Sequence, residues 1–257
     1  MFGESPGKVR KKSGRNRLVT GFSMRGRSFL EAAPPPFYAT GVRQTDGARF
    51  RMSRKSPIFA FMKNIVFDLG GVVFARNIKR CTQEFIDFFS FVRSERMPRF
   101  WEEYDRGTST FEEVTRTLAD MNGCSLEKCA SYLRYSIELQ EPVQPTEALI
   151  RQLKQAGYRL YILSNMSREF IAYLRTFPVY GLFEGEVVSC EEGGVKPEPR
   201  IYELLLQRFG LDPAETLFID DRGINLEAAA AFGIHTQRFD PKAPEATCRL
   251  LREQLLG

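Results

Sequence analysis

Polar side chains follow several apolar runs of the sequence, at positions where they could meet. Three are carboxylates, which bind hard cations such as Mg²⁺, and an aspartate can also attack phosphorus and form an aspartyl phosphate. A hydroxyl, an ammonium group and the backbone N–H groups of Gly-rich turns suit phosphate oxygens. The residues at these positions are Asp68, Ser164 with Asn165, Lys196, and the adjacent pair Asp220 and Asp221. Together they predict chemistry on a phosphate group with the help of a divalent cation.

Strands and helices alternate around these residues. The apolar patterns and turn residues predict strands and helices in alternation, which implies parallel βαβ units and an open, three-layer, Rossmann-like α/β sheet. The expected strands cover 65–67, 158–163, 185–189, 216–219 and 234–238, and the expected helices cover 145–155, 168–176, 199–209 and 226–232. Ligands of such sheets bind at the carboxyl ends of the strands, so the polar residues above are expected to converge there.

Residues from about 78 to 141 interrupt this alternation with an all-helical insert. Their apolar residues recur at helical spacing, and no strand is predicted among them. Thr110, or alternatively Ser109, and Ser125 have the side chains of helix N-caps. The aromatic stripe of Phe85, Phe88 and Phe89 is interpreted as the core of the insert rather than as a substrate site.

Charge divides the chain into a basic leader and an acidic domain. Residues 1–61 hold 13 Lys and Arg against 3 Asp and Glu, a balance of +10, whereas residues 62–257 hold 24 basic and 29 acidic residues, a balance of −5. The leader lacks periodicity and is expected to be disordered, or to precede a true translation start at Met62. A nucleic-acid-binding arm and a transit peptide are the alternatives. Because the basic excess is confined to the leader, a nucleic-acid partner is not expected for the domain.

Composition excludes several other classes. The single histidine, His235, rules out zinc sites and phosphohistidine relays that need a second imidazole. Five scattered cysteines predict reduced thiols in a cytoplasmic protein, and Cys190 has no histidine to activate it. The most apolar stretch, 57–74, is interrupted by Lys63, Asn64 and Asp68, so no membrane span is expected.

Four motifs in order resemble those of the haloacid dehalogenase (HAD) superfamily over roughly residues 62–240. They are Asn64-Ile-Val-Phe-Asp-Leu-Gly-Gly-Val, Leu163-Ser-Asn, Gly194-Val-Lys-Pro-Glu-Pro-Arg-Ile-Tyr, and Phe218-Ile-Asp-Asp-Arg-Gly-Ile-Asn. The helical insert stands where the family places a small helical cap. Trp101-Glu-Glu-Tyr-Asp-Arg-Gly is similar to the cap of a branch that contains an α-glucose-1-phosphate phosphatase and the phosphatase half of soluble epoxide hydrolase. The resemblance implies a HAD-like core of residues 62–76 and 142–257, with a cap of residues 77–141.

The resemblance also implies a role for each polar residue. Asp68 would be the nucleophile and, with the backbone carbonyl of Gly70, a ligand of Mg²⁺. Ser164, the Asn165 amide and Lys196 would bind phosphate, and Lys196 would also neutralise charge on Asp68. Of the acidic pair, Asp221 would bind the metal directly and Asp220 would act in the outer shell through water. Asn225 would brace the acidic loop.

One position departs from the pattern of the family's phosphatases. Most carry a second aspartate two residues after the nucleophile, as general acid and base, and here that residue is Gly70. General acid–base help is typically worth about 10²–10⁴ in rate. Either a cap residue replaces this missing aspartate as general acid and base, or the substrate has a good leaving group, as a sugar 1-phosphate does. Asp105 is the first cap carboxylate to consider, although its position favours a solvated place at a helix end.

Three functions are consistent with these residues. The favoured one is a Mg²⁺-dependent phosphatase of a small phosphorylated metabolite, such as a sugar 1-phosphate. The second is a catalytically impaired phosphate-binding or regulatory protein, which Gly70 favours and the intact Asp68, Lys196 and Asp221 oppose. The third is a 2-haloacid dehalogenase, which would need no metal and so no acidic pair.

Overall fold

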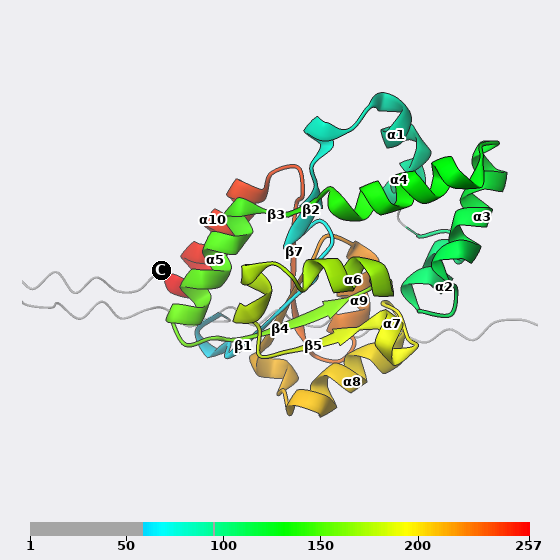
Figure 1. Ribbon diagram of the computed structural model, residues 1–257. Helices are drawn as coiled ribbons and strands as arrows, with labels where there is room; N and C mark the ends of the chain where they lie inside the picture. The colour runs from blue at the N-terminus through cyan, green and yellow to red at the C-terminus, as the bar shows by residue number, and fades with distance from the viewer. Residues whose placement is uncertain (1–58, 95) are drawn as a thin grey trace, which may run out of the picture. The chain divides into compact units, whose positions relative to one another are not determined.

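A computed structural model describes residues 59–94 and 96–257 of the chain. Five parallel strands form one sheet in the order β5-β4-β1-β6-β7 (Figure 1). The strands are β1 (Asn64–Phe67), β4 (Arg159–Ser164), β5 (Gly185–Val188), β6 (Thr216–Asp220) and β7 (His235–Arg238). Every residue of β1 pairs with β4 on one side and β6 on the other, which places β1 at the centre of the sheet. The predicted parallel α/β sheet is confirmed.

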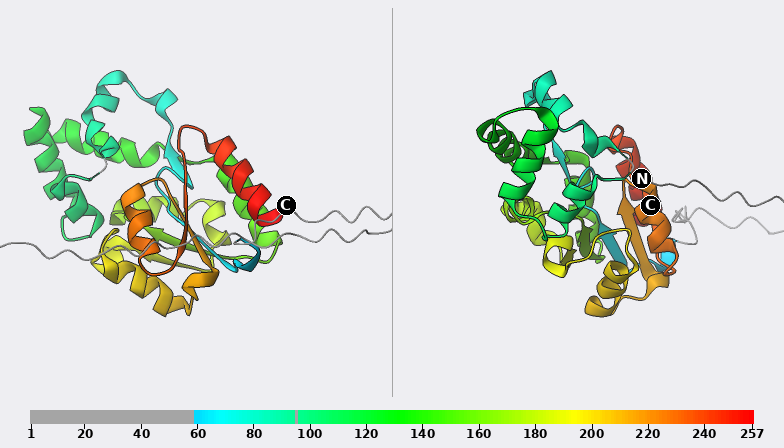
Figure 2. Two further views of the ribbon diagram at one scale, coloured as in Figure 1. Left: turned by 180° about the vertical axis from the view of Figure 1, so that it is seen from behind. Right: turned by 90° about the vertical axis from the view of Figure 1, so that its right-hand side faces the viewer.

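Alternate side chains of β1 enter two different hydrophobic clusters, one on each face of the sheet. Ile65 and Phe67 belong to the cluster formed with α5, α6 and α10. Val66 belongs to the cluster formed with α8 and α9. This period of two is the pattern of a strand buried on both faces. The flanking helices are α5 (Gln144–Gln155), α6 (Arg168–Leu174), α10 (Pro244–Leu256), α8 (Pro199–Phe209) and α9 (Gly223–Ala230). They give the three-layer arrangement seen in Figure 2.

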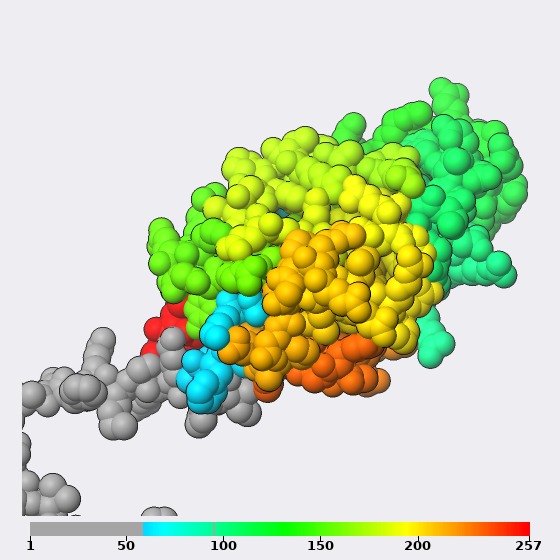
Figure 3. Space-filling model, turned by 90° about the horizontal axis from the view of Figure 1, so that it is seen from below, coloured from blue at the N-terminus to red at the C-terminus, as the bar shows by residue number. Residues whose placement is uncertain are grey.

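Four helices between β2 and β3 form the cap, with an aromatic core of their own. They are α1 (Gln83–Phe88), α2 (Arg99–Asp105), α3 (Phe111–Asn122) and α4 (Leu126–Glu138). Phe85, Phe88 and Phe89 lie in this core, as predicted, and Phe170 of α6 joins it from the core domain. Phe89 also lines the cavity above Asp68, so its place is not confined to the core of the insert. Thr110 caps α3 through a reciprocal capping box with Glu113. In the space-filling view from below, the green cap helices lie beyond the edge of the yellow and orange core (Figure 3).

Two short strands and a C-terminal helix were not expected. β2 (Phe74–Arg76) pairs in antiparallel fashion with β3 (Gln140–Pro142), at the residues where the sequence divides core from cap. The expectation that 78–141 holds no strand is therefore wrong at Gln140 and Glu141. Three residues are too few to show alternation, and the pairing joins segments 64 residues apart in the register Arg76↔Gln140.

The remaining short elements are η1 (Phe59–Phe61), η2 (Ile78–Arg80), η3 (Ser90–Arg93), η4 (Pro178–Leu182), α7 (Ser189–Glu192) and η5 (Pro213–Glu215).

The proposed disordered leader falls mostly on residues 1–58, which lie outside the described residues. Its last three residues, Phe59–Phe61, form the 3-10 helix η1, and Phe59 packs against the core. Within residues 59–94 and 96–257, no helix has the length and apolar character needed to cross a bilayer.

Candidate active site

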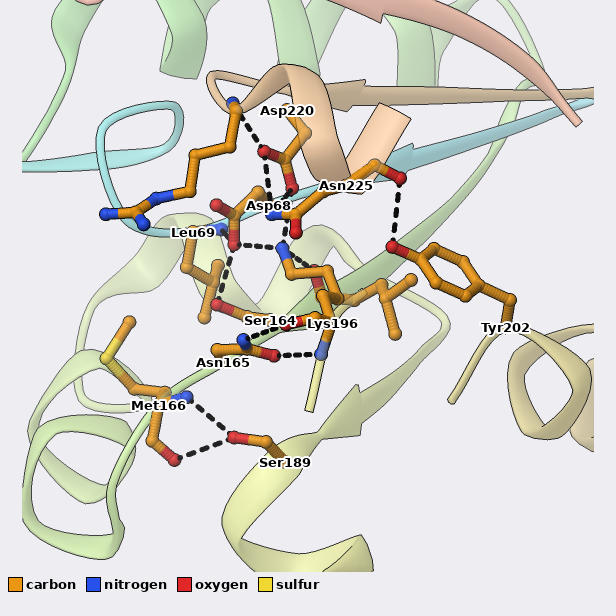
Figure 4. Close-up of polar contacts among 12 residues, drawn as sticks. Asp68, Leu69, Ser164, Asn165, Met166, Ser189, Lys196, Tyr202, Asp220 and Asn225 are labelled. Carbon is orange, nitrogen blue, oxygen red and sulfur yellow. Dashed lines mark hydrogen bonds and ion pairs between the residues drawn. The ribbon is translucent and has the colours of Figure 1, made fainter. Parts of the chain in front are cut away.

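The ends of three adjacent strands bring the predicted site residues together. Asp68 directly follows β1, and its backbone N–H donates to the Ile219 carbonyl of β6 at 2.9 Å. Ser164 ends β4 and Asp220 ends β6, on the two sides of β1. The expected convergence at one edge of the sheet is therefore present, and Figure 4 shows the resulting network.

Asp68 is held through one of its two carboxylate oxygens. Oδ1 accepts hydrogen bonds from the Leu69 N–H at 2.7 Å and the Ser164 hydroxyl at 2.8 Å. Lys196 Nζ lies 2.9 Å from the same oxygen. Oδ2 carries no contact among these residues (Figure 4). Burial raises the pKa of Asp68, Lys196 opposes this rise, and the charge of Asp220 adds to it. The side chain is thus oriented with one oxygen available.

Lys196 connects the two carboxylates at the base of the site. Its Nζ contacts Asp68 Oδ1, Asp220 Oδ2 at 2.7 Å and the Leu163 carbonyl at 2.9 Å. These three acceptors match the three N–H donors of an ammonium group. Burial alone would lower the pKa of Lys196, but the charges of Asp220 and Asp68 outweigh it and raise the pKa. The lysine is therefore a buried, fully bonded cation.

Asn165 positions the loop that carries Lys196. Its side-chain oxygen accepts from the Lys196 N–H at 2.7 Å, and its Nδ2 donates to the Lys196 carbonyl at 2.9 Å. Asn165 and Lys196 both line a cavity above the site, whereas Ser164 is buried. The hydroxyl of Ser164 is donated to Asp68 rather than directed into the cavity.

The adjacent aspartates Asp220 and Asp221 differ in their surroundings. Asp220 is fully buried, and both of its oxygens accept from Asn225 Nδ2 at 3.1 Å. The Arg222 N–H and Lys196 complete its contacts. Asp221 lines the cavity instead, and its Oδ2 is so close to the turn after Asp68 that a Cβ at Gly71 would be 2.9 Å away. Asp221 is thus placed to bind a ligand, and Asp220 is occupied by protein groups.

Asp68, Asp220 and Asp221 form a group that could hold a metal ion. One oxygen of each lies within 4.8 Å of the others. Burial, followed by repulsion from Asp68 and Asp220, raises the pKa of Asp221 to about 7. A divalent cation with oxygen preference would relieve this crowding of negative charge. The donor set therefore fits Mg²⁺.

Core and cap together line the cavity, which has a volume of about 810 Å³. The core contributes Asp68, Gly70 and the residues above, and the cap contributes apolar side chains together with charged ones such as Arg93, Arg99 and Glu102. Cap and linker side chains in the wall include Ile78, Ile86, Phe89, Val92, Met97 and Trp101. This volume exceeds what a phosphate ion needs and is typical of pockets that enclose an organic ligand.

Asp105, expected to be solvated at a helix end, is instead buried. It is the last residue of α2, but its exposure is only 7% and it lines the cavity with Asp68. Burial raises the pKa of Asp105 to about 7, while the charge of Arg222 opposes that rise. The expectation failed because docking of the cap on the core, which no local pattern reveals, removes this helix end from water.

Contacts on both sides of Asp105 fix it against the core. The Tyr104 hydroxyl donates to Glu169 Oε2 at 2.7 Å, and Arg106 makes a two-pronged ion pair with Glu198 at 2.8 and 2.7 Å. The Asp105 carbonyl accepts from the Ser189 hydroxyl at 2.5 Å. Gly107 has a φ of +78° and lies very close to Cys190. A Cβ added at Gly107 would be only 2.5 Å from the backbone carbonyl oxygen of Cys190.

The sequence did not single out Tyr202 as a residue of the site, and it assigned His235 and Cys190 no catalytic role. Tyr202 donates its hydroxyl to the Asn225 carbonyl at 2.9 Å, and its place within the third motif was the only available signal. His235 begins β7 and is not among the residues that line the cavity. Burial raises the pKa of the Cys190 thiol to about 11, consistent with an unreactive cysteine.

Comparison with known proteins places this geometry in a family. The model of haloacid dehalogenase-like hydrolases matches residues 62–233. A sesquiterpene phosphatase of Aspergillus oryzae is 31% identical over 197 residues, which cover 76% of this chain and 97% of the relative. A D-ribitol-5-phosphate phosphatase of Bacteroides thetaiotaomicron is 26% identical and is covered to 92%, over 70% of this chain. A crystal structure of a HAD family enzyme of the same bacterium, in complex with magnesium and inorganic phosphate, is 28% identical, with a TM-score of 0.55 over 70% of this chain and 95% of that one.

Proposed function

Because the chain belongs to the haloacid dehalogenase-like hydrolases, we propose that it is a Mg²⁺-dependent phosphatase that acts through a phosphorylated Asp68. The observation that carries this proposal is the asymmetry of Asp68. One oxygen is bound by Ser164 and Lys196, and the other has no contact with them. A carboxylate held in this way is oriented without being blocked, as an attacking group requires.

The metal would be held by Asp68, the Gly70 carbonyl and Asp221, with Asp220 in the outer shell. Asp68, Gly70 and Asp221 line the cavity, and the fully buried Asp220 does not. When bound, Mg²⁺ would neutralise negative charge on the phosphate. Replacing Asp221 with alanine should weaken Mg²⁺ binding more than replacing Asp220, as measured by isothermal titration calorimetry on folded variants. The reverse order would overturn this assignment.

The first chemical step transfers the phosphoryl group to Asp68. An O–P bond forms from the Asp68 oxygen, and the bond from phosphorus to the leaving oxygen breaks. The second N–H of Asn165 would bind the phosphate, and Ser164 would join it by turning its hydroxyl away from Asp68. Lys196 would bind the phosphate by exchanging its contact with Asp68 Oδ1 for one with a phosphate oxygen. These donors act mainly by positioning and by neutralising charge, which supply most of the catalysis in phosphoryl transfer.

Asp105 would supply the proton that Gly70 cannot. It lines the cavity with Asp68, and a pKa of about 7 lets its carboxyl group carry or accept a proton near neutral pH. It would protonate the leaving oxygen. It would then take a proton from the water that attacks phosphorus, so that the Asp68–phosphate bond breaks and inorganic phosphate is released.

The wall of the cavity favours a substrate with an apolar body. Phe89, Val92 and Trp101 line the space above the phosphate site and would pack against an apolar body, while Arg93, Arg99 and Glu102 add charged groups to the same wall. The relative that is a sesquiterpene phosphatase supports the same reading. A sugar or sugar-alcohol phosphate is the alternative substrate, in keeping with the D-ribitol-5-phosphate phosphatase.

A panel of phosphate esters, assayed with and without Mg²⁺, tests this proposal. Phosphate release should require Mg²⁺, favour isoprenyl phosphates over ribitol 5-phosphate, and fall to background in Asp68→Asn. Asp120→Asn, an exposed aspartate on α3, is the matched control and should keep full activity. Activity without Mg²⁺ or in Asp68→Asn would contradict the mechanism. Release of halide from 2-haloacids would instead support the dehalogenase alternative, for which the acidic pair has no use.

A further inference from the structure

Arg76 places a positive charge in the wall of the cavity, at the point where the chain leaves the core for the cap. It is the last residue of β2, and its partner in the register is Gln140 of β3, which lines the same cavity. Its guanidinium carbon lies 4.9 Å from the centre of the Phe89 ring and 5.5 Å from that of Phe85. The aromatic core of the cap therefore holds the charged group in place.

This arginine has no acidic partner within residues 59–94 and 96–257. Its Nε is buried and without a hydrogen bond, and its guanidinium forms no ion pair there. Arg106 and Arg175, by contrast, each contact two glutamates. Burial lowers the pKa of Arg76, the nearby Cys81 thiol opposes that shift, and the positive charge of Arg93, another residue of the cavity wall, adds to it. Burying a charge without a partner is unfavourable, so the arrangement favours an anion in the cavity.

The geometry of the guanidinium group indicates which anion would fit. The Phe89 and Phe85 rings lie at cation–π distance from the guanidinium carbon, and neither ring supplies an oxygen acceptor for its N–H donors. Those donors form a rigid fork that matches the paired oxygens of a carboxylate or a phosphate. Lys196 already pairs with Asp68 and Asp220 below the cavity, so its charge is compensated within the site, whereas that of Arg76 is not compensated by any acidic residue that the structure describes.

We propose that Arg76 binds a second acidic group of the substrate, a carboxylate or a further phosphate, apart from the phosphate that is cleaved. The inference rests on the proposed phosphatase function and narrows its substrate class. The substrate would be a phosphate monoester whose apolar body carries a second anionic group. Arg76 would then determine specificity rather than take part in bond cleavage.

Matched pairs of substrates test this assignment on the full chain. Alkyl phosphates of increasing length are compared with ω-carboxyalkyl phosphates and with alkanediol bisphosphates of the same length. The wild-type protein should prefer an acid-bearing substrate in kcat/KM by about 10- to 100-fold, the range expected for hydrogen bonds to a charged group. The acidic group, carboxylate or second phosphate, that gives the larger increase in kcat/KM is the one that Arg76 binds.

Arg76→Met should abolish that preference, and Arg76→Lys should retain only part of it because lysine lacks the fork. Arg99→Met is the control, since Arg99 lines the same cavity but is 91% exposed and pairs with Glu103. The assignment would be overturned if Arg76→Met still preferred the acid-bearing substrate. It would also be overturned if kcat/KM fell equally for the acid-bearing and the plain alkyl phosphate of each pair.

A binding measurement separates this inference from the phosphatase proposal. Alkylphosphonates and ω-carboxyalkylphosphonates, which cannot be hydrolysed, are titrated calorimetrically into wild-type protein and Arg76→Met. The carboxylated ligand should bind about 10- to 100-fold more tightly to the wild type only. If the protein hydrolyses no ester but shows this difference, the phosphatase proposal fails and the role of Arg76 stands. Equal affinities in both proteins would refute the role of Arg76.

Discussion

Asp105→Asn should stabilise the protein at neutral pH while impairing its activity. In the native state, burial raises the pKa of Asp105 from 3.8 to about 7. The unfolded chain therefore releases this proton near pH 4, while the native state keeps it until about pH 7. Because the unfolded state then binds fewer protons, the free energy of unfolding falls as the pH rises through that window.

The size of the effect follows from the two pKa values. The difference between 3.8 and about 7 corresponds to at most about 4 kcal/mol. Relaxation and water entry reduce such penalties, so we expect Asp105→Asn to gain about 2 kcal/mol above pH 7. The gain should shrink as the pH falls toward 4 and vanish below about pH 3, where Asp105 is protonated in both states.

Urea denaturation between about pH 4 and pH 8, in buffer with a chelator, measures this difference. Circular dichroism follows the whole domain, and the single tryptophan, Trp101, reports on the cap next to Asp105. Asp120→Asn on the surface of α3 is the control and should follow the wild type at every pH. A gain that does not change with pH, or a loss of stability at pH 8, would refute the burial argument.

Two glycine substitutions give further predictions. Gly70 has space for a side chain. Adding Gly70→Asp to the Asp105→Asn variant should therefore restore activity on primary alkyl phosphates, by at most about 10²–10⁴ in kcat/KM. No gain in the double variant would mean that Asp105 is not the missing acid. Gly107→Ala should lower the free energy of unfolding by about 2 kcal/mol or more, because its Cβ would meet the Cys190 carbonyl at φ of +78°. Gly123→Ala, at φ of +61° in open space, is its control and should cost less by urea denaturation.

The sequence predicted the sheet and the residues at its edge because both depend on local patterns. Apolar runs that stop at Asp68 and before Asp220 mark the ends of buried strands, and the topology of parallel βαβ units brings those ends together. The helix starts at Thr110 and Ser125 were likewise readable, since capping is a local interaction.

Features that depend on the docking of cap and core could not be predicted. The burial of Asp105 results from contacts that Tyr104 and Arg106 make with distant glutamates. The unpaired charge of Arg76 becomes evident only when the short strands β2 and β3 bring it into the cavity. Such long-range contacts leave no periodic signal in the sequence.

The most direct test of the account is to trap the phosphorylated enzyme. The protein is mixed with a phosphate ester and Mg²⁺, quenched in acid during turnover, reduced with borohydride, and digested for mass spectrometry. Formation of an aspartyl phosphate predicts that the peptide containing Asp68 carries the reduced product of that residue, homoserine, and that Asp68→Asn gives none. Phosphate release by the wild type without modification of Asp68, or modification at another residue, would contradict Asp68 as the nucleophile.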